Sequence, residues 1–289
     1  MKKKLVVHIG TPKTGTSFLQ DVCVKNYDTL LNAGILYPGI KDYKFIEKAN
    51  VAINASHILR LFFNEKNKET LCGLIHDNLT TVFNYNVDTV LISDETLIAY
   101  NPSNKKNLFI FECLIEVCKG LDIELSFVAY YRKPSKYLPS HWAQLVKKHK
   151  ETLPLVDFVE KQKIPYWNNL LVLHEAFDNI TIYSYDKEIA TENGLIASFF
   201  KVLGIDSSTL ELLPNVVVNE SLSLNCLTAL RLINAEFEDE TIKSIENTLT
   251  NAKPKNKLNK AVLTKELEKF VDDLYEEELY ELDKITSAS

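Results

Sequence analysis

A short segment near the start of the chain has the residue types that bind a phosphate or sulfate group. It reads GTPKTGTS (Gly10–Ser17) and joins an apolar run to a pattern typical of a helix. Glycines let backbone amides approach an anion, a helix N-terminus adds exposed N–H donors and a positive dipole end, and Lys13 supplies a full charge. An ordinary strand-to-helix turn is the alternative, but it does not need lysine, glycines and hydroxyl groups together. The segment predicts an anion-binding loop.

The spacing within this loop differs from that of nucleotide triphosphatases. Their loop reads G-x-x-x-x-G-K-[ST], with the lysine directly after the second glycine. Here four residues separate Gly10 from Gly15, but Thr16 and Ser17 follow, and the lysine stands at position 13. A lysine at that position lies beside the loop and does not extend along the helix start to β and γ phosphates. The loop therefore favours a shorter 5′ anion.

A second candidate anion-binding group follows a later apolar run. Arg132 ends that run, Pro134 stands at an expected helix start, and Ser140 comes eight residues after the arginine. Proline suits the first turn of a helix, and the planar guanidinium can bind two phosphate oxygens at once. Taken alone, Arg132 could form a salt bridge and Ser140 could face solvent. Together with the lysine-shifted loop, the pair indicates a second phosphate site.

The loop sequence resembles the 5′-phosphosulfate loop, Pro-Lys-x-Gly-[ST]-[ST], of sulfotransferases that use 3′-phosphoadenosine 5′-phosphosulfate (PAPS). The resemblance implies that the 5′-phosphosulfate is bound by Pro12, Lys13, Thr14, Gly15, Thr16 and Ser17. It also implies that Arg132 and Ser140 bind the 3′-phosphate, and that the product is 3′,5′-adenosine bisphosphate. The chain resembles bacterial carbohydrate sulfotransferases of the heparan type more than it resembles the cytosolic steroid and phenol enzymes, which implies a carbohydrate acceptor.

Weaker matches extend the resemblance over most of the chain. The segment NES (Asn219–Ser221) resembles a late Asn-x-Ser segment of that family, and IYSYD (Ile182–Asp186) resembles a tyrosine-acid pair that ends a strand. Tyr166 and Trp167 could stack on adenine or form a core aromatic pair. The family's Gly-x-x-Gly-x-x-Lys is absent near the C-terminus, so the resemblance does not identify what covers the nucleotide.

Sulfuryl transfer depends on positioning and electrostatics, as phosphoryl transfer does, and the acceptor must also lose a proton. Lys13, helped by the amides of residues 14–17, is the candidate for stabilising the leaving phosphate. Two carboxylates, Asp94 and Glu95, directly follow an apolar run. The resemblance implies that Glu95 is the general base, because related enzymes carry Ser-x-Glu at this place. A magnesium-binding acid pair and a helix N-cap by Ser93 or Asp94 are alternatives.

Histidine provides a second candidate for the base. His57 lies where similar bacterial proteins also have a histidine followed by apolar residues. An unperturbed histidine pKa near 6.5 would suit proton transfer, but a lone helical histidine is more often structural, so Glu95 ranks above His57. His8, inside the first apolar run, is expected to be a packed residue near the loop and not a catalyst.

The order of strand and helix patterns predicts an α/β fold. Strands are expected at 5–9, 89–93, 124–131 and 180–184. Helices are expected at 16–32, 45–63, 69–83 and 106–119, after Pro134, and at 195–203, 222–235, 239–249 and 263–282. Strands separated by helices imply a P-loop-like, doubly wound, mainly parallel sheet flanked by helices, with a helical C-terminal part. No linker pattern interrupts residues 1–289, so one sulfotransferase-like domain is expected.

Composition limits the partners. A net charge of −6 and a pI near 5.6 argue against duplex DNA or an anionic membrane. The five cysteines form no Cys-x-x-Cys pair, so neither a zinc site nor a disulfide framework is suggested, and no metal is expected in the chemistry. No apolar run reaches about 18 residues, which predicts no membrane insertion and a cytoplasmic location. The lysine-rich segment 251–260 is interpreted as a solvated loop in preference to a lid over an anion.

These features predict an enzyme that transfers a sulfuryl group from PAPS to a hydroxyl or amine of a small-molecule or saccharide acceptor. Two alternatives stay open at the level of sequence: a P-loop kinase or nucleotidase that uses Mg-ATP, and a non-catalytic nucleotide-binding protein. The acceptor pocket is expected in the regions 37–85 and 145–175, because such pockets are built from variable loops and helices.

Overall fold

The computed structural model describes residues 2–41, 44–46, 67–98, 108–211, 222–251 and 261–288. The chain divides into two compact units, each built from segments distant in sequence. Unit 1 comprises Met1–Tyr131, Pro165–Pro214 and Glu278–Ser289, and unit 2 comprises Arg132–Ile164 and Asn215–Glu277. The single domain expected from the sequence stays a prediction.

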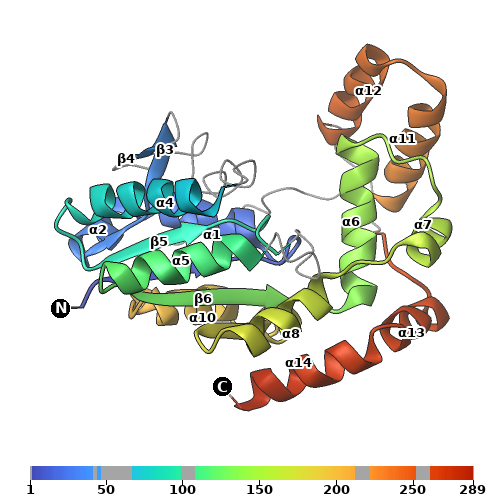
Figure 1. Cartoon of the computed structure of the whole chain (residues 1–289). Helices are drawn as coiled ribbons and strands as arrows, with labels where there is room; N and C mark the ends of the chain where they lie inside the picture. Colours follow the sequence, from blue (N-terminus) through green and yellow to red (C-terminus); the bar gives the residue numbers. More distant parts are fainter. Residues whose placement is uncertain are drawn as a thin grey trace. The chain divides into compact units, whose positions relative to one another are not determined.

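A five-stranded parallel sheet forms the centre of unit 1, in the order β2-β5-β1-β6-β7 (Figure 1). Its strands are β1 (Lys4–His8), β2 (Ile35–Leu36), β5 (Thr89–Ser93), β6 (Glu124–Tyr131) and β7 (Ile180–Ser184). The bounds of β5, β6 and β7 are those predicted, because a short apolar run is typical of a strand that is covered on both faces. The two-residue β2 is too short to leave such a pattern. The predicted α/β class with a mainly parallel sheet is confirmed.

Helices cover both faces of this sheet (Figure 1). On one face, Val6 and Val128 pack in a core cluster with residues of α1 (Thr16–Lys25) and α10 (Gly194–Val202). On the other, the ring of Phe127 lies 5.2 Å from that of Phe111 in α5 (Leu108–Gly120). Phe127 and Val128 are neighbours in β6, and successive strand residues point to opposite faces, so the sheet is doubly wound. Other helices with residues in unit 1 are α2 (Tyr27–Asn32), α4 (Lys68–Phe83), α8 (Tyr166–Ala176), α9 (Tyr185–Glu188), η2 (Ser207–Thr209) and α14 (Glu276–Ala288).

The helix expected at 263–282 is divided into α13 (Lys265–Asp273) and α14. Two helix predictions in unit 1 are also wrong in part. The helix expected at 16–32 is broken at Asn26, which ends α1 and precedes α2. The helix expected from Phe45 does not begin there, because Phe45 lies in β4 (Lys44–Ile46), paired antiparallel with β3 (Gly39–Lys41). The Phe45 amide donates to Oδ1 of Asn78 in α4 at 2.8 Å, so a tertiary contact outweighs the local helical pattern. Residues 47–63 of that prediction lie outside the described residues.

Unit 2 is helical over its described residues, which confirms the predicted helical C-terminal part. Its helices are α6 (Pro134–Lys148), α7 (Leu155–Lys161), α11 (Leu224–Glu236), α12 (Asp239–Asn251) and α13 (Lys265–Asp273). Pro134 stands in the first turn of α6, as expected. The Asn234 amide of α11 donates to the carbonyl oxygens of Val146 at 2.8 Å and Glu151 at 3.2 Å, which fixes α11 beside the end of α6.

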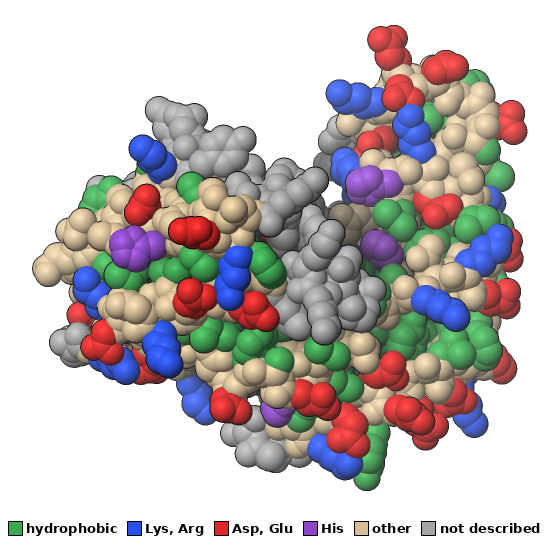
Figure 2. Space-filling model, viewed as in Figure 1, with side chains coloured by type: hydrophobic (Ala, Val, Ile, Leu, Met, Phe, Trp, Pro, Cys, Tyr) green, Lys and Arg blue, Asp and Glu red, His purple; other side chains and the backbone are tan. Residues whose placement is uncertain are grey.

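The surface mixes charges of both signs. In Figure 2, Lys and Arg side chains are interspersed with Asp and Glu side chains over the face shown, and no broad basic area is present among the coloured residues. Of the helices in the described ranges, none combines the length and the apolar character that crossing a bilayer requires.

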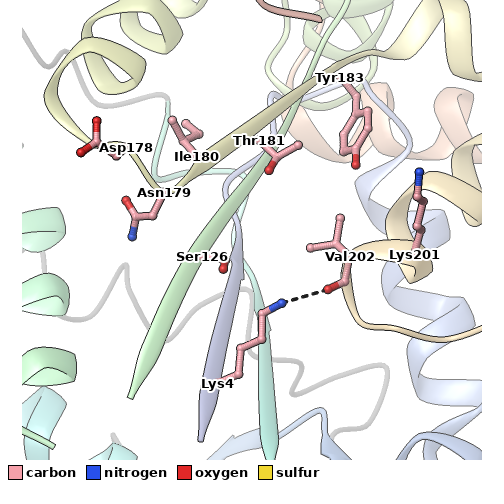
Figure 3. Close-up of a pocket in the computed structure, with 9 residues that line it drawn as sticks. All are labelled: Lys4, Ser126, Asp178, Asn179, Ile180, Thr181, Tyr183, Lys201 and Val202. Atoms are coloured by element: carbon pink, nitrogen blue, oxygen red, sulfur yellow. Dashed lines mark hydrogen bonds between the residues drawn. The ribbon is translucent and has the colours of Figure 1, made fainter. Parts of the chain in front are cut away.

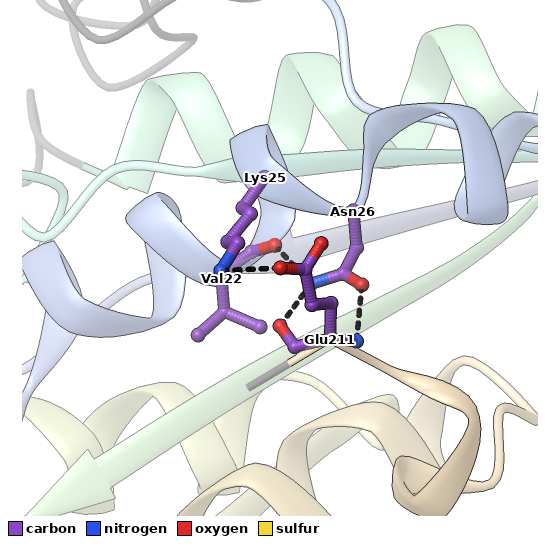
Figure 4. Close-up of polar contacts among 4 residues, drawn as sticks. All are labelled: Val22, Lys25, Asn26 and Glu211. Atoms are coloured by element: carbon purple, nitrogen blue, oxygen red, sulfur yellow. Dashed lines mark hydrogen bonds and ion pairs between the residues drawn. The ribbon is translucent and has the colours of Figure 1, made fainter. Parts of the chain in front are cut away.

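One buried side chain connects α1 to the end of a distant segment of unit 1 (Figure 4). Asn26 donates from Nδ2 to the carbonyl oxygens of Val22 at 2.9 Å and Glu211 at 3.0 Å, and its Oδ1 accepts from the Glu211 amide at 2.7 Å. The Glu211 carboxylate lies 2.8 Å from Nζ of Lys25, but three quarters of that carboxylate side chain is exposed, at 73%. The amide contacts should therefore contribute more to stability than the ion pair.

We expect Asn26→Ala to lower the free energy of unfolding by about 2 kcal/mol, because the backbone groups of Glu211 lose their partners. Lys25→Ala is the matched control and should cost less than about 1 kcal/mol, since it removes an ion pair whose carboxylate is largely exposed. Urea unfolding of both variants measures the difference. Equal losses in the two variants would contradict this assignment.

Candidate functional site

The site of unit 1 lies at the carboxyl ends of its strands. In the parallel register, His8 of β1 stands opposite Ser93 of β5, and Ser184 of β7 stands opposite Tyr131 of β6. The loops that follow these strands therefore leave the sheet at one edge. Strand β1 lies between β5 and β6, where the chain order changes from one side of the sheet to the other. Ligands of open parallel sheets bind at this kind of switch point.

The predicted anion loop is held against β6 by backbone hydrogen bonds. The Ile9 amide donates to the Val128 carbonyl at 2.9 Å, and the Thr11 amide donates to the Tyr130 carbonyl at 2.8 Å. The Tyr130 amide in turn donates to the Gly10 carbonyl at 2.6 Å. Pairing with β6 thus continues beyond the last residue of β1. It fixes the first half of the loop as firmly as a strand.

The second half of the loop turns back through left-handed backbone conformations. Lys13 has φ 67° and Gly15 has φ 80°. A methyl group at Gly15 would lie 2.8 Å from Cδ2 of Leu195 and 3.4 Å from Cε2 of Tyr185, so only glycine fits there without rearrangement. A positive φ at a lysine costs of order 1 kcal/mol and is most often retained at functional sites. The structure thereby brings the predicted tyrosine segment, through Tyr185, next to the loop.

The start of α1 offers donors to an anion. Leu19 makes the first intrahelical bond, to the Gly15 carbonyl at 3.0 Å, so the amides of the preceding residues have no partner within the helix. The Thr16 hydroxyl is buried, with 3% of the residue exposed, and has no hydrogen-bond partner among the residues that the structure describes. A buried hydroxyl without a partner is costly. An anion at the helix start would accept from it, which fits the predicted role of the loop.

Glu95 lies directly against the loop. A methyl group at Gly10 would come within 3.0 Å of Cα of Glu95, so the two backbones are in close contact. The neighbouring Asp94 is fully buried, and its Oδ1 accepts from the amide of Thr96 at 3.0 Å and from the Thr96 hydroxyl at 2.6 Å. These bonds lie in a turn over residues 95–98, where the structure has no helix, so the helix N-cap alternative for Asp94 is not confirmed. Glu95, the other acidic residue of this turn, is partly exposed.

A buried polar cluster supports this edge of the sheet. Nδ1 of His8 lies 2.9 Å from the Ser93 hydroxyl, and the Gln20 side-chain amide donates to the Ser93 carbonyl at 3.1 Å. Burial lowers the pKa of His8 to about 3, so the ring is neutral at physiological pH. Its ring also packs edge-on to Tyr130 and Phe199. His8 is therefore the packed residue that the sequence suggested, and its hydrogen bond joins β1 to β5 beneath the loop.

Tyr37 was missed by sequence reasoning. Its ring is fully buried, and burial raises the pKa of its hydroxyl well above the usual value, with smaller contributions from Cys23, Asp21 and Asp94. It packs in the same core cluster as α1 and α10. No pattern around position 37 distinguishes this tyrosine from others, so only the fold could reveal it.

The residues predicted to bind a second phosphate lie in unit 2 and line a cavity of about 240 Å³. Arg132 and Ser140, eight residues apart in sequence, both lie on its wall. The other lining residues are Ser135, Lys136, Pro139, Ala143, Leu227, Ala261, Val262 and Glu268. Sequence reasoning did not single out Lys136 or Glu268. The structure therefore brings the predicted arginine and serine to one cavity and adds a lysine and a carboxylate to them.

Other predicted residues have a different outcome. His57 and the Asn219–Ser221 segment lie outside the described residues, as do 252–260 of the lysine-rich segment. Trp167 is 2% exposed and belongs to the core. For this residue the core role is therefore favoured over stacking on adenine. The ring centroids of Tyr166 and Trp167 are 6.5 Å apart.

A second cavity, of about 350 Å³, opens at the opposite edge of the sheet (Figure 3). Lys4, the first residue of β1, donates there to the Val202 carbonyl at 3.2 Å, and Ile180, the first residue of β7, lies on the wall. The cavity contains none of the predicted residues. Because it lies at the amino ends of the strands, it is separate from the anion loop.

Comparison with known proteins gives a limited result. No protein-family model matches the chain, and no curated protein matches it significantly. A solved structure, a sulfotransferase from Alicyclobacillus acidocaldarius, is similar to this chain with a TM-score of 0.45 and 12% sequence identity. The similarity covers 84% of this chain and 99% of that one.

The buried His8 makes a pH-dependent contribution to stability. Its pKa is about 3 in the folded chain and 6.5 when exposed, so the unfolded chain binds the extra proton between these values. Stability should therefore fall as the pH drops below 6.5, by about 1.4 kcal/mol for each pH unit. Urea unfolding between pH 7 and pH 5 should show a steeper loss for the wild type than for His8→Gln, which cannot titrate. Parallel profiles would show that folding does not lower the pKa of His8.

Proposed function

We propose that the protein is a PAPS-dependent sulfotransferase that transfers a sulfuryl group to a hydroxyl or amine of a carbohydrate acceptor. The observation that carries the proposal is the start of α1, where the Thr16 hydroxyl is buried without a partner among the described residues and the first-turn amides are open. These donors suit the anionic 5′ end of the nucleotide. The shift of the lysine to position 13 favours a short phosphosulfate over a triphosphate.

The loop residues hold the 5′ group and stabilise charge. Pro12, Lys13, Thr14, Gly15, Thr16 and Ser17 are the proposed binding residues. When bound, PAPS supplies an activated sulfuryl group whose transfer leaves negative charge on a phosphate. Lys13 is the proposed stabiliser of that charge, together with the amides at the helix start, because preorganised donors are most effective where charge develops. The pairing of Gly10 and Thr11 with β6 supports this role by keeping the donors in place.

Glu95 is the proposed general base. Its backbone contacts Gly10, so it belongs to the same edge of unit 1 as the loop. The bonds that Asp94 accepts from Thr96 hold the turn that carries Glu95, and Glu95 is proposed to take the proton of an acceptor hydroxyl or amine. His57 is the second candidate for the base on sequence grounds alone.

Arg132 and Ser140 are the proposed 3′-phosphate ligands. Their position on the wall of one cavity in unit 2 supports assigning both to a single anion. A guanidinium can bind two phosphate oxygens and a serine hydroxyl can donate to a third. This assignment distinguishes PAPS from ATP, which has no 3′-phosphate.

The alternative is a kinase or nucleotidase that uses Mg-ATP. It would require Asp94 and Glu95 to act as a metal-binding pair. The engagement of one Asp94 oxygen by Thr96 disfavours that arrangement. A non-catalytic nucleotide-binding protein would retain the same loop and lack turnover.

Calorimetric titration with 3′,5′-adenosine bisphosphate and with Mg-ATP tests the proposal. We expect the wild type to prefer the bisphosphate, and Lys13→Ala and Arg132→Ala each to weaken its binding at least about tenfold, the effect of losing a charge-assisted hydrogen bond. Lys148→Ala is the control, because this exposed lysine of α6 lies outside the cavity. A preference of the wild type for Mg-ATP would overturn the sulfotransferase assignment.

The base assignment has a separate test. Glu95→Gln should bind the bisphosphate as the wild type does and lower sulfuryl transfer by about 100-fold or more, because only proton transfer is lost. Radiolabelled PAPS with a panel of saccharide acceptors measures the turnover. Unchanged turnover in Glu95→Gln together with loss of turnover in His57→Ala would assign the base to His57.

A further inference from the structure

Helix α13 places two carboxylates on the start of α6, both within unit 2. Glu268 Oε1 lies 2.6 Å from Nζ of Lys136, and both residues line the cavity that contains Arg132. One turn later, the Asp272 carboxylate accepts from the Ser135 amide at 3.0 Å and from the Ser135 hydroxyl at 2.9 Å. Residues four apart in a helix lie on the same face, so one face of α13 provides both contacts.

The groups that these carboxylates contact are those that bind phosphate. An ammonium group, a first-turn helix amide and a hydroxyl are all typical anion ligands. In unit 2 they are taken by side chains of the chain itself, next to an arginine and a serine proposed to bind the 3′-phosphate. The carboxylates of α13 therefore contact the same donor groups that a bound anion would contact.

The two contacts differ in how easily an anion could replace them. Ser135 is 3% exposed, and its hydrogen bonds to Asp272 resemble a buried helix cap. The Lys136 and Glu268 side chains are 47% and 30% exposed, so their ion pair is screened by water and contributes at most about 1 kcal/mol. The Asp272 contact is thus a structural cap. The Glu268 contact is the exchangeable one.

From this difference we infer that Lys136 is a further anion-binding residue of the Arg132 cavity and that Glu268 is its internal competitor. The inference rests on the proposed function of Arg132 and Ser140 and extends it. When a phosphate monoester binds, Lys136 forms its ion pair with the phosphate instead of with Glu268, and the Glu268 carboxylate turns to solvent. In the bound state, Arg132, Lys136 and the Ser140 hydroxyl all contact one anion. Because the anion must first displace Glu268 from Lys136, the Glu268 contact lowers the affinity of the cavity for that anion.

Binding of adenosine 3′-monophosphate tests this inference, with adenosine 5′-monophosphate as the comparison ligand. Glu268→Gln should bind the 3′-monophosphate about threefold to fivefold more tightly than the wild type, the equivalent of an exposed ion pair of up to about 1 kcal/mol. Lys136→Met should weaken binding about tenfold. Glu246→Gln is the matched control: Glu246 forms an ion pair of the same 2.6 Å length with Lys148 of α6, outside the cavity, and its removal should leave affinity unchanged.

A double variant separates competition from simple charge repulsion. If Glu268 acts by holding Lys136, its substitution should give no gain in a Lys136→Met background. A gain that persists there would show that Glu268 merely repels the ligand, and would overturn the inference. Equal affinities of the wild type and Glu268→Gln would also overturn it and leave the proposed function intact. Failure of the wild type, and of Glu268→Gln, to bind any 3′-phosphorylated nucleotide would overturn both, provided that thermal unfolding shows all the variants to be folded.

Discussion

The parallel pairing of β1 with β5 on one side and β6 on the other is the constraint on which the site of unit 1 depends. Because both neighbours run parallel to β1, the loops after β1 and β5 leave at one edge, and the extra length of β6 gives the anion loop a strand to pair with. The Thr11 amide reaches the Tyr130 carbonyl by this extension. Without it, the glycines would make the loop mobile, and the donors at the start of α1 would not have a fixed direction.

Each unit has a helix whose first turn can bind an anionic group, but the first turn of α1 is uncapped and that of α6 is already in contact with a carboxylate. At α1, glycine precedes the helix and no side chain caps it, so the amides are open to an external anion. At α6, a carboxylate of the chain already occupies the first turn through Ser135. The same electrostatic principle thus favours an external anion at α1 and holds a carboxylate of the chain itself at α6. Which of the two occurs depends on whether a distant acidic residue reaches the helix.

The sequence predicted what local residues determine. The strands at 89–93, 124–131 and 180–184 were predicted correctly, because apolar runs of that length are typical of buried strands. The anion-binding role of the loop, inferred from residue types that are rarely combined, stays a prediction. Contacts between distant residues could not be predicted. The Lys136 and Glu268 side chains are 132 residues apart in sequence, and the break at Asn26 depends on a bond to Glu211. Phe45 was assigned to a helix because its partner Asn78 cannot be identified from local periodicity.

The attachment of the loop to β6 also has an entropic consequence. A segment that is already ordered by sheet hydrogen bonds loses little conformational freedom when an anion arrives, so little of the interaction free energy is used for ordering. The glycine at position 15, packed under Leu195 and Tyr185, restricts the loop further. Selectivity among anions at α1 would then depend on the charge and size of the ligand, and scarcely on the readiness of the loop to fold around it.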